Sequence, residues 1–504
     1  SISGFIFSRI LIVSCLVLIQ IAIICVAFIW FYDFIEYIWG GFSLLSIVLV
    51  VWIINDQSNP AFKLAWVLPV LVFPVVGGFL YLFIETNFGG KTFNKNVQQI
   101  LNDTKFLLKT KDEVRNQLKE KPLNTLSTYI ENVSGFPVYQ NTTLEYFPLG
   151  EAKFAAMKQE LSLAKEFIFL EYFIIQEGIM WNEILAVLVK KAAEGVDVRV
   201  MYDGIGTIRT LPINYDKQLK AMGIKAKVFS PVVPLVSTHQ NNRDHRKILV
   251  IDGKVAFNGG INLADEYINQ KKVHGHWKDV AIILKGEAVK SFTLMFLQMW
   301  NIDEKRKEAY TPYLEDKLSC HSSGFVIPYC DNPLDSDRVG EIVYMDMIYK
   351  AKNYVHIMTP YLIIDNEMLT ALSVAAKSGV DVKIMMPHIP DQKVPFDTAR
   401  SYYPQLLKAG VKIYEYTPGF VHAKMFVCDG NKAVVGTINL DYRSLYHHFE
   451  CATYMEDVES ITAIEEDFND TLNQCQQVSM KTYKQLPWIK RLMGKIYRLL
   501  APLM

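Results

Sequence analysis

The chain has 504 residues, enough for about three domains of ordinary size. Its 52 basic and 52 acidic residues balance, so no overall positive field favours nucleic acid as a partner. Its seven cysteines form no CxxC pair, which favours small buried hydrophobic side chains over a zinc site or a disulfide framework.

The amino-terminal part of the chain is far more apolar than the rest. Three segments, 10–32, 37–55 and 64–84, carry no charged side chain. About 20 apolar residues suffice to cross a bilayer as a helix. A cleaved signal peptide explains at most the first segment, and a buried helical hairpin is the other alternative. We expect residues 1–90 to form a membrane anchor of two or three helices, in a multi-pass membrane protein.

Two further segments have helical patterns. Residues 91–135 are polar, with apolar side chains at helical intervals, and predict a solvated helical linker. Residues 484–504 predict a basic amphipathic helix, because Lys490, Arg491, Lys495 and Arg498 fall along one side of it. Such a helix either packs on a domain surface or lies in a membrane interface and attracts anionic lipid, and the sequence supports both alternatives.

The most informative feature is a pattern that occurs twice. Each copy has a His, a Lys two positions later, an Asp seven positions later and an Asn seventeen positions later. A Gly-Val-Asp-Val string precedes each copy, at 195–198 and 379–382. A repeat of about 180 residues fits two homologous domains, which we expect at 136–318 and 319–483. The residues are His245, Lys247, Asp252 and Asn262 in the first copy and His422, Lys424, Asp429 and Asn439 in the second.

The local pattern predicts a strand, a tight turn and a second strand at each copy. Both apolar runs after the Lys end in Asp-Gly, which favours a hairpin. Side chains alternate along a strand, so each His shares a face with its Lys, whereas the Asp points to the other face. The Asp would lie ~23 Å away at ~3.3 Å per residue. We therefore expect Asp252 and Asp429 to hold the turns.

A histidine that acts as a base needs a partner that orients its ring. Glu266 and Glu450 follow the Asn of each copy and are the candidates, with an ordinary exposed glutamate as the alternative. Lys247 and Lys424 can bind phosphate oxygens, and the amides of Asn262 and Asn439 can donate to them. One of His447 and His448 can face the same site.

Two such half-sites suit phosphoryl transfer without a metal or another cofactor. One imidazole attacks phosphorus as a nucleophile, and the other protonates the departing alkoxide and then activates the acceptor. The sequence treats the two histidines alike. It therefore does not say which of them is the nucleophile.

The doubled H-x-K-x(4)-D pattern, followed each time by a G-[GST]-x-N turn, resembles the phospholipase D superfamily. Within it, the strings at 242–247, 259–267 and 439–450 are similar to bacterial cardiolipin synthases. The string from Asn59 to Gly77 resembles their amino-terminal membrane hairpin, whereas 10–32 is additional to that hairpin. The resemblance implies an α/β fold. Two tandem phospholipase D-like domains with mixed sheets flanked by helices would be related by pseudo-twofold symmetry, with the motifs at their interface.

The resemblance also implies an activity. Two phosphatidylglycerol molecules would give cardiolipin and glycerol through a phosphohistidine intermediate, with these lipids and no nucleic acid as partners. In relatives the first histidine is commonly the nucleophile, which assigns that role to His245. The alternative is a membrane-bound phospholipase D or phosphodiesterase, in which water is the acceptor. The motif positions implied to be catalytic are His245, Lys247, Asp252, His422, Lys424 and Asp429.

Overall fold

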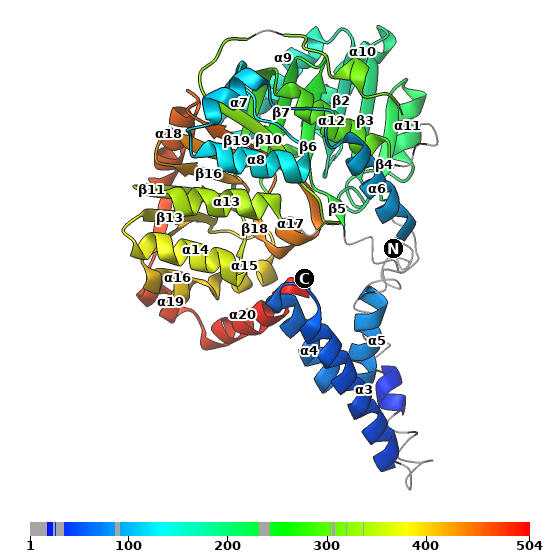
Figure 1. Cartoon of the computed structure of the whole chain (residues 1–504), viewed down its shortest axis with the longest axis vertical. Helices are drawn as coiled ribbons and strands as arrows, with labels where there is room; N and C mark the ends of the chain where they lie inside the picture. Colours follow the sequence, from blue (N-terminus) through cyan, green and yellow to red (C-terminus); the bar gives the residue numbers. More distant parts are fainter. Residues whose placement is uncertain are drawn as a thin grey trace. The chain divides into compact units, whose positions relative to one another are not determined.

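A computed structural model describes residues 18–23, 26, 35–85, 91–230, 242–302, 304, 308–318, 320–335 and 337–503. They fall into two compact units (Figure 1). The smaller unit contains the amino-terminal helices and the last residues of the chain, and the larger unit contains both repeats.

The smaller unit is built from three apolar helices, α3 (Ile35–Asn55), α4 (Pro60–Val72) and α5 (Pro74–Glu85). The short η5 (Ala501–Leu503) contacts α4. Leu49 and Ile53 of α3 pack with Trp66, Val70 and Tyr81 in one buried cluster. Because each of the three helices contributes to it, this cluster joins them into one apolar core.

The apolar segment 64–84 lies in two helices, α4 and α5, instead of one. The helix breaks at Phe73, which precedes Pro74, a position where helical backbone is disfavoured. The rings of Trp66 and Tyr81 lie 5.6 Å apart, so α4 and α5 fold back on each other. A helix of about 13 residues is ~20 Å long, short of a ~30 Å hydrocarbon core. Considering the described residues alone, no helix has the length and hydropathy needed to cross a bilayer, and most of 10–32 lies outside them.

The segment predicted as a solvated linker is partly buried. It forms α6 (Lys91–Thr104), α7 (Asp112–Leu118) and α8 (Leu123–Ser134). Leu126 and Ile130 of α8 are buried, and α8 packs against α13 (Val339–Lys350) and β10 (Phe325–Asp331) of the second repeat. Although this segment is polar overall, one side of α8 is apolar and packs on the second repeat.

The first repeat is built on a seven-stranded mixed sheet in the order β1-β9-β7-β6-β2-β3-β4. The parallel strands β2, β3 and β4 form one side, and the antiparallel strands form the other. Their bounds are β1 (Thr142–Phe147), β2 (Phe167–Tyr172), β3 (Asp197–Asp203), β4 (Lys225–Phe229), β6 (Lys247–Ile251), β7 (Val255–Gly259) and β9 (Ala281–Gly286).

The second repeat copies this sheet. Its order is β10-β19-β17-β16-β11-β13-β14, followed by β20 at the edge. The copy extends to register, since Gly259 pairs with Ala281 in the first sheet and Gly436 with Ala452 in the second. The mixed sheets of the expected fold are therefore confirmed. The further strands are β11 (Tyr354–Met358), β13 (Asp381–Pro387), β14 (Lys412–Tyr416), β16 (Met425–Cys428), β17 (Lys432–Gly436), β19 (His448–Glu456) and β20 (Cys475–Val478).

Helices cover both sheets, as the expected α/β architecture requires (Figure 1). In the first repeat they are α9 (Gly150–Leu163), α10 (Ile179–Ala193), α11 (Tyr215–Ala221), η3 (Asp265–Ile268), α12 (Val289–Trp300) and η4 (Thr311–Tyr313). In the second they are α13, α14 (Asn366–Lys377), α15 (Lys393–Arg400), α16 (Tyr403–Ala409), α17 (Tyr442–Tyr446) and α18 (Ile461–Leu472), followed by α19 (Met480–Gln485) and α20 (Trp488–Leu500). A small parallel pair, β12 (Leu362–Ile363) and β18 (Leu440–Asp441), completes the second repeat.

Two short parallel pairings join the repeats reciprocally. β5 (Arg243–Asp244) pairs with the start of β19, and β15 (Gly419–Val421) pairs with β8 (His276–Lys278). Each repeat therefore inserts the residues just before its motif histidine against a strand of the other repeat. This exchange is what pseudo-twofold symmetry predicts, and it fixes the position of the site.

Candidate active site

Each motif begins a hairpin, as its spacing predicts. β6 pairs with β7 around Asp252-Gly253, and β16 pairs with β17 around Asp429-Gly430. These four residues have positive φ, between 50° and 71°, as the central residues of a type I′ turn require, and a third residue completes each loop. The aspartate tolerates this backbone because its short side chain forms local hydrogen bonds.

The two turn aspartates are structural. Asp252 accepts hydrogen bonds from the backbone N–H groups of residues 165–167 at 2.7–2.9 Å. Asp429 accepts from residues 352–354 at the same distances. Although burial raises the pKa of Asp429, these three N–H groups hold it below its usual value. Neither carboxylate forms a hydrogen bond with a motif histidine. Strand alternation predicts this, because it places each Asp on the opposite face from its His.

The carboxylate that orients each histidine comes from the other repeat. His245 Nδ1 lies 2.8 Å from Glu450 Oε1, and His422 Nδ1 lies 2.7 Å from Asp279 Oδ2. The reciprocal strand pairings cause this exchange, since His245 N–H donates to Phe449 O at 3.0 Å. In the other pair His422 N–H donates to Lys278 O at 2.7 Å. In both pairs the acceptor immediately precedes the carboxylate residue in the chain.

The structure places Glu450, and not Glu266, against a motif histidine. Glu266 lies on η3 and forms no hydrogen bond with either motif histidine. Sequence reasoning missed Asp279 as the second orienting carboxylate. The signal was available, because Asp279 and Glu450 each stand two residues before an alanine that opens an apolar strand segment of the duplicated sheet.

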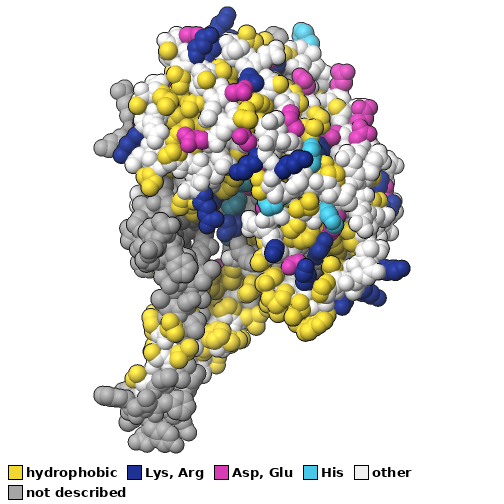
Figure 2. Space-filling view, turned by 180° about the vertical axis from the view of Figure 1, so that it is seen from behind, with side chains coloured by type: hydrophobic (Ala, Val, Ile, Leu, Met, Phe, Trp, Pro, Cys, Tyr) yellow, Lys and Arg dark blue, Asp and Glu magenta, His cyan; other side chains and the backbone are white. Residues whose placement is uncertain are grey.

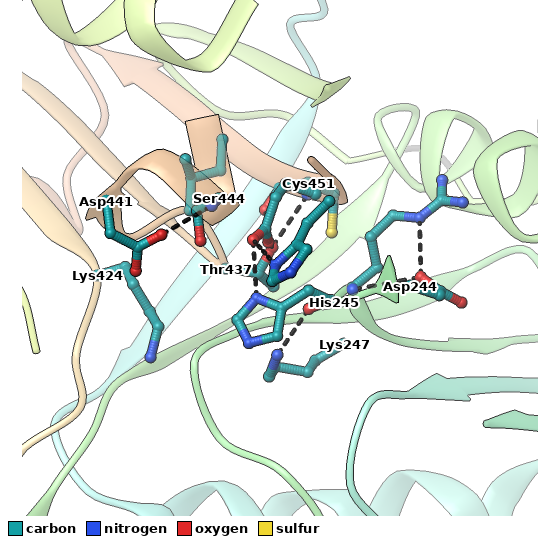
Figure 3. A network of polar contacts seen from close by, with 12 residues as sticks. Asp244, His245, Lys247, Lys424, Thr437, Asp441, Ser444 and Cys451 are labelled. Carbon is teal, nitrogen blue, oxygen red and sulfur yellow. Dashed lines mark hydrogen bonds and ion pairs between the residues drawn. The ribbon is translucent and has the colours of Figure 1, made fainter. Parts of the chain in front are cut away.

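The second residue of each G-[GST]-x-N turn lies against the orienting carboxylate that belongs to the same repeat. Thr437 Oγ1 donates to Glu450 Oε2 (Figure 3). In the other copy the position is Gly260, where a Cβ would lie 2.2 Å from Asp279 Oδ1. A hydroxyl therefore supports the longer glutamate arrangement, and a glycine makes room for the shorter aspartate.

Both motif lysines are buried beside the histidines, and the charges of both act on His245. In Figure 3 the labelled side chains of His245, Lys247 and Lys424 point toward a common space. Lys247 Nζ donates to His245 O at 2.6 Å, and Lys424 Nζ donates to His422 O. Burial lowers the pKa of Lys247 to about 8 and that of Lys424 to about 7. Figure 2 shows Lys, Arg and His side chains gathered in the middle of one face.

His422 Nδ1 has two close neighbours, Asp279 at 2.7 Å and Lys424 Nζ at 2.8 Å. It cannot donate to the first and accept from the second at once. Although burial raises the pKa of Asp279, His422 and Lys424 hold it below its usual value, so Asp279 is a carboxylate. We assign the proton to Nδ1, donating to Asp279, which leaves Nε2 with its lone pair.

Both histidines are neutral near pH 7. Burial, followed by the charges of Lys247 and Lys424, lowers the pKa of His245 well below its usual value. Burial and the charge of Lys424 lower the pKa of His422 to about 4, against the opposing effect of Asp279. A neutral imidazole with a free Nε2 is the form that can attack phosphorus or accept a proton.

The two motif asparagines, both expected to donate to phosphate oxygens, differ in their contacts. Asn262 Oδ1 accepts from the Ile174 N–H, and its Nδ2 donates to Tyr267 Oη at 2.8 Å. Its amide is thereby committed to its own domain. Asn439 is also buried, and its Oδ1 has no hydrogen-bond partner among the described residues.

A different ring stacks beside each motif histidine. His448 lies 5.4 Å from His245, and Trp277 lies 5.5 Å from His422, with nearly equal ring tilts of 43° and 44°. The nitrogens of both rings are buried without a hydrogen-bond partner among the described residues. His448 Nδ1 is 3.6 Å from Glu450 Oε1, too far for a hydrogen bond, and burial lowers its pKa to about 3. Both rings thus retain unused polar atoms next to the reactive imidazoles.

His245, His448 and Glu450 also form a set of potential metal ligands, which sequence reasoning did not foresee. Two imidazoles and a carboxylate suit zinc. The charges of Lys247 and Lys424, which already act on His245, oppose a divalent cation at this position. A metal would also take the Nδ1 atom that Glu450 orients.

Comparison with known families agrees with this geometry. The family described as "Cardiolipin synthase, PLD-like domain" matches residues 157–300 and 344–472, more than half of the chain. The chain belongs to the cardiolipin synthase family of the phospholipase D superfamily. A second family, described as "Phospholipase D-nuclease N-terminal", matches residues 44–85.

Relatives of this cardiolipin synthase family member extend over nearly the whole chain. A cardiolipin synthase of Halalkalibacterium halodurans is 35% identical over 92% of the chain and 94% of its own length. An uncharacterized protein of Streptococcus mutans is 52% identical over 90% of the chain and 99% of its own length. The crystal structure of a phosphatidylserine synthase from Haemophilus influenzae superposes with a TM-score of 0.57. It is 14% identical and covers 75% of this chain and all of that one, which shows a shared fold.

Proposed function

We propose that this protein is a cardiolipin synthase that transfers a phosphatidyl group from one phosphatidylglycerol to another and releases glycerol. The observation that carries the proposal is the pair of neutral histidines, each oriented by a carboxylate of the opposite repeat. A single reaction centre that needs both repeats suits a two-step transfer with one imidazole for each role. The cardiolipin synthases among the relatives support the choice of lipid.

In the first step His245 Nε2 attacks the lipid phosphorus and forms an N–P bond. The bond between phosphorus and the oxygen of the head-group glycerol breaks. His422 gives that oxygen a proton, so free glycerol leaves. Burial and Lys424 lower the pKa of free His422 to about 4. The negative charge of the bound phosphate offsets Lys424 and allows His422 to take up the proton.

In the second step His422 acts as the base. It removes a proton from a glycerol hydroxyl of the second phosphatidylglycerol, whose oxygen attacks the phosphohistidine. The N–P bond breaks, cardiolipin leaves and His245 regains its neutral ring. Lys247 and Lys424 stabilise the charge that develops on the phosphate oxygens in both steps.

The apolar amino-terminal segment suits a membrane location for this chemistry. We propose that residues 1–90 anchor the protein in the bacterial cell membrane, where its lipid substrates lie. The exposed apolar residues of α3 and α4, among them Trp52, Leu64 and Val72, support contact with lipid. The α4–α5 hairpin is compatible with a segment that enters the apolar layer without crossing it.

Hydrolysis is the second candidate, because water can resolve the same phosphohistidine. The unpartnered nitrogens of His448 and Trp277 favour transfer, since a glycerol head group offers hydroxyls that can bind them. The reaction products distinguish the candidates. Cardiolipin with glycerol identifies the transferase, whereas phosphatidic acid as the only lipid product identifies the hydrolase.

The test uses the purified full chain with phosphatidylglycerol in detergent, with EDTA present. We expect cardiolipin and glycerol in equal amounts. His245→Asn and His422→Asn should each abolish turnover, because neither imidazole can replace the other. His321→Asn, at an exposed histidine away from the motifs, is the matched control and should retain activity. Near-normal turnover by either motif variant, or activity that requires a divalent ion, would contradict the mechanism.

A further inference from the structure

The helix α20 exposes its apolar side. Its six large apolar side chains are between 38% and 66% exposed. At 100° per residue they share one continuous side of the helix. A helix that packs on a domain normally buries such a side and exposes its charges. The six residues are Trp488, Ile489, Leu492, Ile496, Leu499 and Leu500.

The side of α20 opposite these residues contacts α15, which lies near it in Figure 1. Gly494 is the buried residue of the helix, and a Cβ there would lie 2.5 Å from the backbone oxygen of Asp397 on α15. The missing side chain lets the two helices approach closely. Arg491 and Arg498 lie on this side and are partly buried. The orientation is therefore fixed by packing and leaves the apolar side outward.

The charges of α20 also match a particular surface. The helix carries four cations and no acidic residue. Lys490 and Lys495 are both exposed; Lys495 borders the apolar side, and Lys490 lies about 80° beyond its other edge. In this position long lysine side chains can reach anionic head groups while the apolar residues lie deeper.

We propose that α20 is an interfacial helix that inserts its apolar side into a membrane surface containing anionic lipid. The proposal rests on the proposed function and deepens it, since it assigns a further lipid-contacting element to a helix that begins in the unit with both repeats and ends in the smaller unit. Val394 on α15, the helix that α20 contacts, is 38% exposed and extends the apolar character of this region. A second copy of the chain is the rival occupant of the surface.

The test measures the depth of individual residues in the full-length protein. Its seven native cysteines are replaced by serine or alanine, and a nitroxide is attached at Leu492→Cys or at Lys490→Cys. The label at Val374→Cys, an exposed apolar position on α14, is the matched control. The protein is reconstituted in phosphatidylcholine vesicles with and without phosphatidylglycerol. Electron paramagnetic resonance then measures accessibility to oxygen and to a water-soluble nickel complex.

We expect the label at 492 to gain oxygen accessibility and to lose nickel accessibility severalfold relative to the label at 374. The gain should increase with phosphatidylglycerol, and the label at 490 should stay accessible to nickel. Equal accessibility at 492 and 374 would overturn the proposal. Spin–spin broadening between labels at 492 would also overturn it, because it identifies a second copy as the occupant.

An activity measurement separates this inference from the proposed function. Leu492→Glu should lower turnover of phosphatidylglycerol in vesicles more than turnover of a dispersed short-chain analogue, and Val374→Glu should lower both equally little. If the wild-type protein makes no cardiolipin, the proposed function fails while the depth measurement still decides the role of α20. If the wild-type protein is active and the label at 492 stays in water, the inference about α20 alone fails.

Discussion

The two half-sites share the carboxylate contact of the histidine ring and differ in the side chains that support it. Nδ1 of each histidine contacts a carboxylate oxygen of the other repeat, at 2.8 Å for His245 and 2.7 Å for His422. The carboxylate is a glutamate supported by Thr437 in one half and an aspartate in the other. Lys424 Nζ lies 2.8 Å from the ring of its own histidine, whereas among the described residues Lys247 Nζ donates to the backbone of its own. The duplicated halves therefore orient both imidazoles in the same way, and their different surroundings are consistent with the separate roles that we propose.

The largest expected effect comes from the orienting carboxylates. Glu450→Gln and Asp279→Asn should each lower kcat by about 10³–10⁴, because an amide cannot hold the imidazole in the same tautomer. The two variants should differ in what accumulates. Glu450→Gln should block formation of the phosphohistidine on His245. Asp279→Asn leaves His245 oriented, so the phosphohistidine should still form, although slowly, and accumulate because His422 no longer activates the acceptor.

Acid-labile and base-stable phosphorus on the protein, measured after a rapid quench, distinguishes these outcomes. The reverse pattern would make His422 the nucleophile. Equal loss with no trapped phosphorus in either variant would mean that the halves have not separated their roles.

A smaller effect concerns pH and the two lysines. Binding of the lipid phosphate requires their cationic forms, whose pKa values burial lowers to about 8 for Lys247 and about 7 for Lys424. Deprotonation removes the positive charge, so kcat/KM should fall as pH rises, by about tenfold between pH 7 and pH 8. Lys424→Arg keeps its charge over this range and should move the decline to higher pH. A flat profile up to pH 9 would show that the lysines do not titrate in this range.

The smallest expected effect compares the rings that stack beside the motif histidines. His448→Phe removes two unpartnered buried nitrogens and should stabilise the protein by about 1 kcal/mol while raising KM. Trp277→Phe also removes an unpartnered nitrogen. However, the indole packs within 5 Å of Tyr267 and Phe420, so this change should destabilise the protein by about 1 kcal/mol. Thermal unfolding in detergent and the KM for phosphatidylglycerol test both, and an unchanged KM in both variants would exclude substrate contact by either ring.

Local sequence patterns were sufficient for the hairpins and for the structural role of Asp252 and Asp429. These features depend on strand alternation and on turn chemistry within a few residues. Glu450 was identified as an orienting carboxylate, whereas its counterpart was sought at Glu266 instead of Asp279. The true pairing depends on β5 lying beside β19 and β15 beside β8, contacts between residues about 140–205 positions apart that no local pattern encodes.

The errors in the apolar and polar segments have the same origin. The segment 64–84 has the composition of one span, yet Pro74 breaks it and Gly77 allows the two pieces to approach. A Cβ at Gly77 would lie 2.3 Å from the Pro69 oxygen. Likewise, α8 reads as polar, and its buried side becomes visible only when α13 is placed against it. Composition sets how much of a segment can be buried, and tertiary contacts decide which side.

The exchange of carboxylates between the repeats has a consequence for synthesis on the ribosome. When the first repeat emerges, it already contains His245, but Glu450 lies 205 residues further along and has not yet been made. A chain that stops before Glu450 would lack the carboxylate that orients the His245 ring. On the proposed function, phosphatidyl transfer would therefore begin only after both repeats have been made and have folded together.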